Sequence, residues 1–82
     1  MSEKIEIFVS DKCPDCTLIM ADRVKNPEKY EGISFYNITE NMANLKRFLY
    51  FRDRLEGYEK AREAGRVGVP SKVINESEVE FL

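Results

Sequence analysis

The feature that most constrains the fold is a helix-like segment set between two strand-like segments near the start of the sequence. Residues 4–9 are rich in β-branched side chains at alternate positions, which predicts a strand. Residues 13–24 then carry apolar side chains at helical spacing, and Asn26-Pro27 ends this helix because the residue before a proline avoids the helical region. Residues 33–38 predict a second strand. Such a βαβ unit requires two parallel strands joined by a right-handed crossover.

The second half of the chain predicts two helical pieces and a terminal hairpin. Thr39 or Asn41 can cap the first of these helices. Residues 58–64 predict a short further helix, and residues 71–74 and 79–82 predict two strands around a turn. The element order is β-α-β-α-α-β-β, an α/β fold with a four-stranded mixed sheet flanked by helices. Apolar positions of the longer helix are spaced by three, four and seven: Met42, Leu45, Phe48, Leu49 and Leu55.

The aromatic side chains divide into two predicted groups. Tyr50 and Phe51 flank the apolar stripe of the longer helix, so we assign them to a small contact surface. Four phenylalanines are predicted to lie in the core: Phe8, Phe35, Phe48 and Phe81.

Length and charge exclude several classes of protein. The chain has 82 residues, so we expect one domain spanning residues 1–82. Lys plus Arg number 13 against 15 Asp plus Glu, and this balance lacks the basic excess of a nucleic-acid binder. The longest uncharged apolar run, residues 17–21, is too short for a membrane span, and residues 1–5 lack the apolar segment of a signal peptide. We therefore expect a cytoplasmic monomer that contacts neither nucleic acid nor membrane.

The chemistry of the chain is narrowed by the absence of histidine from the sequence. This absence excludes histidine acid–base catalysis, Cys-His nucleophile pairs and His-ligated metal sites. What remains is one pair of cysteines, Cys13 and Cys16. In a reducing compartment this spacing is typical of redox or metal chemistry.

The position of the pair favours redox chemistry. Cys13 opens the first predicted helix, where unpaired backbone N–H groups and the helix dipole stabilise a thiolate. Cys16 lies one turn further along, close enough to form a disulfide with Cys13. A metal site remains an alternative, but four-coordinate zinc needs four ligands, so two chains or added small thiols would have to complete it. An inert structural disulfide is the third interpretation.

Several segments resemble the glutaredoxin branch of the thioredoxin fold, and closer still a group of small bacterial glutaredoxin-related proteins. The resemblance covers nearly the whole chain. It implies a thioredoxin-like sheet with strand order two, one, three, four, in which the third strand is antiparallel to the first. The segments that carry the resemblance are residues 4–9, Cys13-Pro14-Asp15-Cys16, Leu45-Lys46-Arg47-Phe48-Leu49, Arg52-Asp53 and Gly68-Val69-Pro70.

This resemblance implies a glutaredoxin-like protein disulfide oxidoreductase. Cys13 would attack the disulfide of a protein or small thiol, Cys16 would resolve the mixed disulfide, and no cofactor would be needed beyond these thiols. The implied substrate-binding residues include Pro14, Val69, whose backbone would pair with a bound thiol peptide, and Pro70, a cis-proline facing the cysteines. The reductant would be glutathione or a flavoenzyme of the thioredoxin-reductase type. Alternatives are a dimeric iron–sulfur module, as some relatives are, and a dedicated electron donor to one reductase.

Glutathione is expected to be a poor reductant here. Many relatives carry a basic residue three positions before the first cysteine, where this sequence has Ser10. The Gly-Gly and Asp-Asp segment that follows the hairpin in glutathione-binding relatives is not found in residues 1–82.

Two cations are further candidates for the site. Lys12 adjoins Cys13 and would stabilise its thiolate or attract an anionic substrate, or is a solvated loop residue. Arg52 falls within the apolar arc of its predicted helix. Three interpretations of Arg52 remain open: its head reaches the helix edge, pairs with a buried carboxylate, or holds an anion in the active-site groove.

Overall fold

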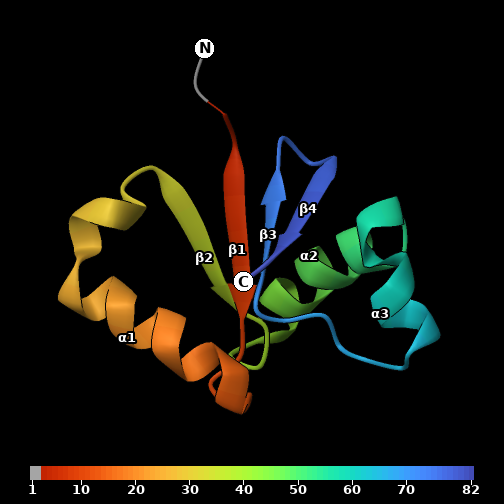
Figure 1. Cartoon of the computed structure of the whole chain (residues 1–82), viewed down its shortest axis with the longest axis horizontal. Coiled ribbons are helices and arrows are strands. Elements are labelled where there is room, and N and C mark those ends of the chain that lie inside the picture. The colour runs from red at the N-terminus through yellow and green to blue at the C-terminus, as the bar shows by residue number, and fades with distance from the viewer. Residues whose placement is uncertain (1–2) are drawn as a thin grey trace.

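A computed structural model describes residues 3–82 and shows one mixed sheet with helices on both sides (Figure 1). Met1 and Ser2, which entered the signal-peptide argument, lie outside the described residues. Within residues 3–82, no helix combines the length and apolar character needed to cross a membrane. The elements are β1 (Ile5–Val9), η1 (Pro14–Cys16), α1 (Thr17–Lys25), η2 (Pro27–Tyr30), β2 (Ile33–Asn37), α2 (Met42–Arg52), η3 (Glu56–Tyr58), α3 (Glu59–Glu63), β3 (Ser71–Ile74) and β4 (Glu78–Phe81).

The sheet has the strand order β2-β1-β3-β4. β1 and β2 are parallel, as the βαβ pattern predicts, and Ile7 of β1 lies opposite Phe35 of β2. β3 is antiparallel to β1, and β4 is antiparallel to β3. The predicted mixed sheet is therefore confirmed, with strand and helix ends shifted by a few residues.

Local sequence signals explain where the helices begin and end. Pro14 occupies the first position of η1, where its missing N–H costs nothing. Asn41, rather than Thr39, caps α2, because its side chain accepts a hydrogen bond from the Asn44 N–H at 2.8 Å. α2 ends at Arg52, so the predicted continuation to Leu55 is wrong.

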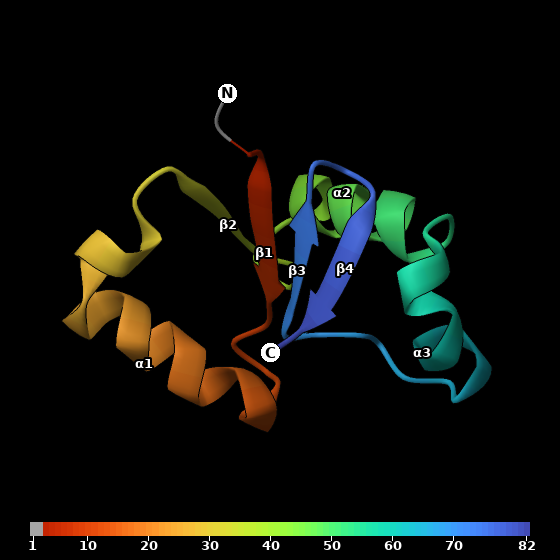
Figure 2. The ribbon, with the colours of Figure 1, turned by 45° about the horizontal axis from the view of Figure 1, so that its top comes forward.

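The helices bury the two faces of the sheet against separate clusters (Figure 2). Ile7 and Val9 of β1 pack with Cys16 on the α1 side. Phe8 packs on the other side with Phe48 of α2, the ring centroids lying 5.3 Å apart. β1 is therefore covered on both faces and forms the centre of the molecule.

Two aromatic predictions are wrong. Phe51 is 1% exposed and packs against Phe8, because it lies one turn after Phe48 on the face of α2 that meets the sheet. Phe81 is 51% exposed, because it lies on the edge strand β4, where its ring meets the Tyr58 ring edge to face.

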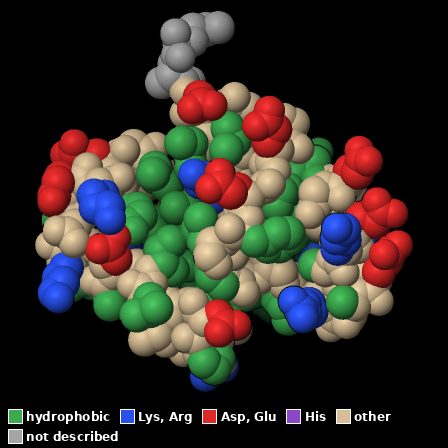
Figure 3. Space-filling view, viewed as in Figure 1, with side chains coloured by type: hydrophobic (Ala, Val, Ile, Leu, Met, Phe, Trp, Pro, Cys, Tyr) green, Lys and Arg blue, Asp and Glu red, His purple; other side chains and the backbone are tan. Residues whose placement is uncertain are grey.

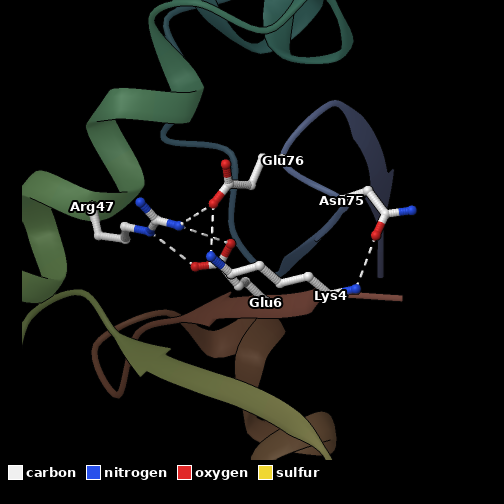
Figure 4. A network of polar contacts seen from close by, with 5 residues as sticks. All are labelled: Lys4, Glu6, Arg47, Asn75 and Glu76. Atoms are coloured by element: carbon white, nitrogen blue, oxygen red, sulfur yellow. Dashed lines mark hydrogen bonds and ion pairs between the residues drawn. The ribbon is translucent and has the colours of Figure 1, made fainter. Parts of the chain in front are cut away.

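A charged network closes the amino end of β1 (Figure 4). Glu6, 1% exposed, accepts hydrogen bonds from Arg47 Nε at 2.9 Å and Nη2 at 3.2 Å. Arg47 also pairs with Glu76 of the β3–β4 turn at 2.8 Å, and Lys4 Nζ pairs with the same carboxylate at 2.7 Å. We call Lys4, Glu6, Arg47 and Glu76 the paired network. It ties α2 and the hairpin to β1.

Candidate functional site

The two cysteines lie just beyond the carboxyl end of β1, where a tight turn leads into η1. The Cys13 N–H donates to the Ser10 carbonyl at 3.2 Å, and the Cys16 N–H donates to the Cys13 carbonyl at 3.1 Å. Cys13 has extended backbone angles and precedes η1, whereas Cys16 ends η1 and directly precedes α1. The turn therefore places both thiols close together at the amino end of a helical segment, as the sequence predicts.

Cys16 is fully buried. Its Sγ packs beside Ile7 and Val9 and accepts a hydrogen bond from the Ser10 N–H at 3.4 Å. The pKa of Cys16 is raised to about 11, chiefly by burial; the nearby Cys13 thiol also raises it, and the Ser10 N–H opposes both. Cys16 is therefore a protonated thiol at neutral pH.

Cys13 is partly exposed and carries a free thiol, as does Cys16. Its Sγ lies 3.9 Å from the carbonyl oxygen of Val69. The Val69–Pro70 peptide bond is cis, as the resemblance implies. The structure thus brings Cys13, Val69 and Pro70 together although more than fifty residues separate them in sequence.

A groove of about 1220 Å³ opens beside Cys13. It extends past the 66–70 loop to α3 and to the end of β4, and Lys12 lines it next to the cysteine. In Figures 1 and 2 this loop runs from α3 along the lower end of the sheet. Pro14, a candidate substrate-binding residue, is not among the described residues that line the groove. Figure 3 shows a separate gathering of hydrophobic side chains over the middle of the sheet, above α1.

Tyr58 supports the loop from beneath. Its hydroxyl shares a hydrogen bond of 2.7 Å with Ser71 Oγ, and both side chains are buried. Gly68 has a φ of +104°, and a Cβ there would meet the Tyr58 ring at 3.3 Å. The Tyr58 side chain therefore lies against Gly68 and bonds to the Ser71 side chain, on either side of Val69 and Pro70.

Arg52, a candidate substrate-binding residue, does not line the groove. Its Nε donates to the Val67 carbonyl at 2.7 Å, and its Nη2 donates to the Arg66 carbonyl at 2.5 Å. Because α2 ends at Arg52, the side chain reaches the returning loop and supplies donors to carbonyls outside any helix or strand. Arg52 therefore braces the loop that leads to Val69.

Ser10 was noted in the sequence only as a departure from relatives, yet it organises the turn. Its side chain is buried and lies 3.0 Å from Thr39 Oγ1. Its Oγ also accepts the Lys12 N–H at 3.1 Å. The Ser10 hydroxyl therefore forms its hydrogen bonds within the chain, with Thr39 and the Lys12 N–H. Its place at the end of a central strand, three residues before Cys13, is the signal that could have identified this role.

The thiol pair supplies two ligands to any metal or cluster. Within residues 3–82, no three cysteine, aspartate or glutamate side chains are grouped so that they could hold a metal ion. A cluster at this site would require further thiols from outside the chain, and Cys13 is the more accessible of the two cysteines.

Comparison with known proteins adds no information about this site. The chain matches no family model, no curated protein and no solved structure.

Proposed function

We propose that this protein is a thiol–disulfide oxidoreductase with a thioredoxin-like, glutaredoxin-type fold. The observation that carries the proposal is the unequal environment of two adjacent thiols. Cys13 opens onto a groove at the start of a helical segment, whereas Cys16 is buried and its pKa is raised by that burial. The strand order β2-β1-β3-β4, with β3 antiparallel to β1, supports the proposed fold.

The proposed reaction moves two electrons from the dithiol to a substrate disulfide. The Cys13 thiolate attacks one sulfur of the substrate disulfide, forms a mixed disulfide and releases the other sulfur as a thiolate, which takes up a proton. Cys16 then loses its proton and attacks Cys13 Sγ. The second substrate sulfur leaves as a thiolate and is protonated, and the Cys13–Cys16 disulfide remains. An external thiol or a reductase restores the dithiol.

Different groups of the chain activate the nucleophile, bind the substrate and resolve the mixed disulfide. Backbone N–H groups and the dipole at the start of the helical segment stabilise negative charge on Cys13. The Val69 backbone, 3.9 Å from Cys13 Sγ, is positioned to pair with an extended substrate, and Lys12 attracts anions to the same mouth of the groove. Burial keeps Cys16 protonated until the mixed disulfide forms, so one thiol attacks and the other resolves.

The reductant is proposed to be a flavoenzyme of the thioredoxin-reductase type in preference to glutathione. Ser10 stands where relatives hold a glutathione carboxylate, and its hydroxyl is occupied by Thr39 and the Lys12 N–H. Charge-assisted hydrogen bonds contribute roughly 1.5–3 kcal/mol each, so the loss of one weakens glutathione binding by about tenfold or more. Physiological disulfides would then be those of a protein, including that of a single partner enzyme.

Two measurements on the purified protein test the proposal. Limiting iodoacetamide should label Cys13 before Cys16, and Cys16→Ser should trap a stable mixed disulfide that Cys13→Ser cannot form. Turnover of a model disulfide should be faster with thioredoxin reductase than with glutathione and glutathione reductase. Preferential labelling of Cys16 would overturn the assignment of the nucleophile.

A dimeric iron–sulfur module is the outcome that would replace this proposal. Anaerobically purified protein should contain no stoichiometric iron or sulfide and should be colourless. A coloured protein that carries iron and fails to reduce any disulfide would show that the cysteine pair holds a cluster.

A further inference from the structure

Three cations line the groove and are the basis of this inference. Lys12 lies next to Cys13, whereas Lys60 and Arg66 lie at the α3 side. Within residues 3–82, none of them forms an ion pair, although five other cations do. Asp15 is the one acidic side chain of the described residues that lines the groove. We call Lys12, Lys60 and Arg66 the groove cations.

The position of Arg66 is fixed by the backbone around it. Its N–H donates to the Ala61 carbonyl of α3 at 2.8 Å, and its own carbonyl accepts from Arg52. Arg66 is thereby tied to the short helix that carries Lys60. Two exposed positive charges are thus presented from one braced part of the groove wall.

The groove also offers apolar surface and considerable length. Val67 is 55% exposed, and the side chains of Phe81 and Leu82 line the same groove and are also exposed. Its volume of about 1220 Å³ exceeds the range of roughly 300–1,000 Å³ that is usual for small-molecule pockets. A groove of this size suits an extended protein segment better than a tripeptide.

The overall charge of the chain makes the cationic groove selective. The formal net charge is −2, so the protein as a whole does not attract acidic partners. Unpaired cations gathered at one cleft steer negatively charged segments to that cleft and raise their rate of association. The charge of the groove therefore opposes the charge of the whole molecule.

We propose that the preferred substrate is a protein disulfide whose cysteine lies in an extended acidic segment with apolar neighbours. Lys60 and Arg66 recognise the acidic side chains, and the surface of Val67 and Phe81 receives the apolar ones. This inference rests on the proposed oxidoreductase function and names its substrate class.

Model peptides test the inference directly. Three short peptides share one cysteine and the same apolar neighbours but carry acidic, neutral or basic flanks, each as its 2-pyridyl disulfide, whose reduction releases a coloured thione. At low salt, the kcat/KM of the wild-type protein should be about tenfold higher for the acidic than for the basic peptide, since exposed pairs contribute roughly 0.2–1 kcal/mol each. This preference should decrease as salt is added.

A charge reversal identifies the residues responsible. The double variant Lys60→Glu/Arg66→Glu should reverse the order of the peptides. The matched variant Lys25→Glu/Lys46→Glu removes the same charge at exposed positions outside the groove and should keep the wild-type order. Equal rates for the three wild-type reactions, or a preference that survives the groove substitutions, would overturn the inference.

Two further results separate the possible failures. If the wild-type protein reduces none of the three peptides, the proposed function fails, whereas reduction without charge preference defeats only the inference about substrate. If the groove variant does not fold, the salt titration of the wild-type preference decides the question. A preference for the acidic peptide that is unchanged by salt would then exclude recognition by the groove cations.

Discussion

At the amino end of β1 the charged side chains form the paired network around Glu6 (Figure 4). The groove cations lie toward its carboxyl end and form no ion pair among the described residues. The first set is built from two acids and two bases that are linked by ion pairs of 2.7, 2.8 and 2.9 Å. The second set lies in the groove that Cys13 also lines. The same strand thus separates charges that are satisfied internally from charges that are free to meet a partner.

This difference separates stability from recognition. A buried carboxylate such as Glu6 is tolerable only while its cation is present, so the paired network must be kept intact for the chain to fold. Solvated cations on a groove wall contribute little to folding, because water already satisfies them. Substitutions at the two ends should therefore have opposite signatures: loss of stability at one end, and altered substrate preference at the other.

The largest expected effect follows from removing Arg47. Arg47→Met leaves the Glu6 carboxylate buried without its partner, and breaking such a pair typically costs about 3–5 kcal/mol. Urea denaturation should show this loss in the free energy of unfolding. The double variant Glu6→Met/Arg47→Met removes both charges and should recover much of it. A single variant as stable as wild type would show that the paired network is not needed for folding.

A smaller loss is expected beneath the groove. Tyr58→Phe removes the hydroxyl that bonds to buried Ser71, and a buried polar group without a partner costs about 1–3 kcal/mol. Thermal and urea unfolding measure the change. The matched control is Tyr50→Phe at an exposed ring, which should change stability by less than about 0.5 kcal/mol. Equal effects of the two substitutions would remove the supporting role assigned to Tyr58.

Much of the fold could be predicted because its signals are local. Asn26-Pro27 ends α1, and Asn41 begins α2, without reference to the rest of the chain. The burial of Glu6 could not be found in this way. Glu6 shares the face of β1 that α2 covers with Phe8, but its partner Arg47 lies 41 residues away in the sequence.

The site was predictable where it depends on a motif and not where it depends on packing. The spacing of Cys13 and Cys16 and the resemblance at Val69-Pro70 identified the centre. The roles of Tyr58 and Arg52 depend on how residues 64–70 return across the molecule, which no local pattern records. For Arg52 the helical pattern leaves three interpretations open, because it does not record that the 66–67 carbonyls lie within reach of the end of α2.

At alkaline pH, the stability of the folded chain should depend on Cys16, which lies beyond the carboxyl end of β1. Burial raises the pKa of Cys16 from 9.0 to about 11, so between these values the folded chain retains a proton that the unfolded chain loses. Stability should therefore decrease by up to about 3 kcal/mol as pH rises through this window, since each unit of pKa difference corresponds to about 1.4 kcal/mol. Cys16→Ser should show a shallower decrease from pH 9 to 11 when compared with reduced wild type. Identical slopes would mean that Cys16 titrates as it does in the unfolded chain.

The smallest expected effect is a loss of stability at acidic pH, and it comes from Glu76 at the amino end of β1. Hydrogen bonds from Lys4 and then from Arg47 hold the pKa of Glu76 below its ordinary value of 4.5. The folded chain therefore binds this proton less readily than the unfolded chain, and the stabilisation is present above pH 4.5 and is lost as pH falls below it. Wild type and Glu76→Gln should differ in stability at neutral pH and converge in acid, and added salt should reduce the difference because Glu76 is half exposed.

Glu78→Gln is the matched control, since this carboxylate lies on the same hairpin without an ion pair among residues 3–82. A Glu76→Gln curve parallel to that of wild type from neutral pH into acid would show that solvent already satisfies Glu76, and the paired network would then reduce to Glu6 and Arg47.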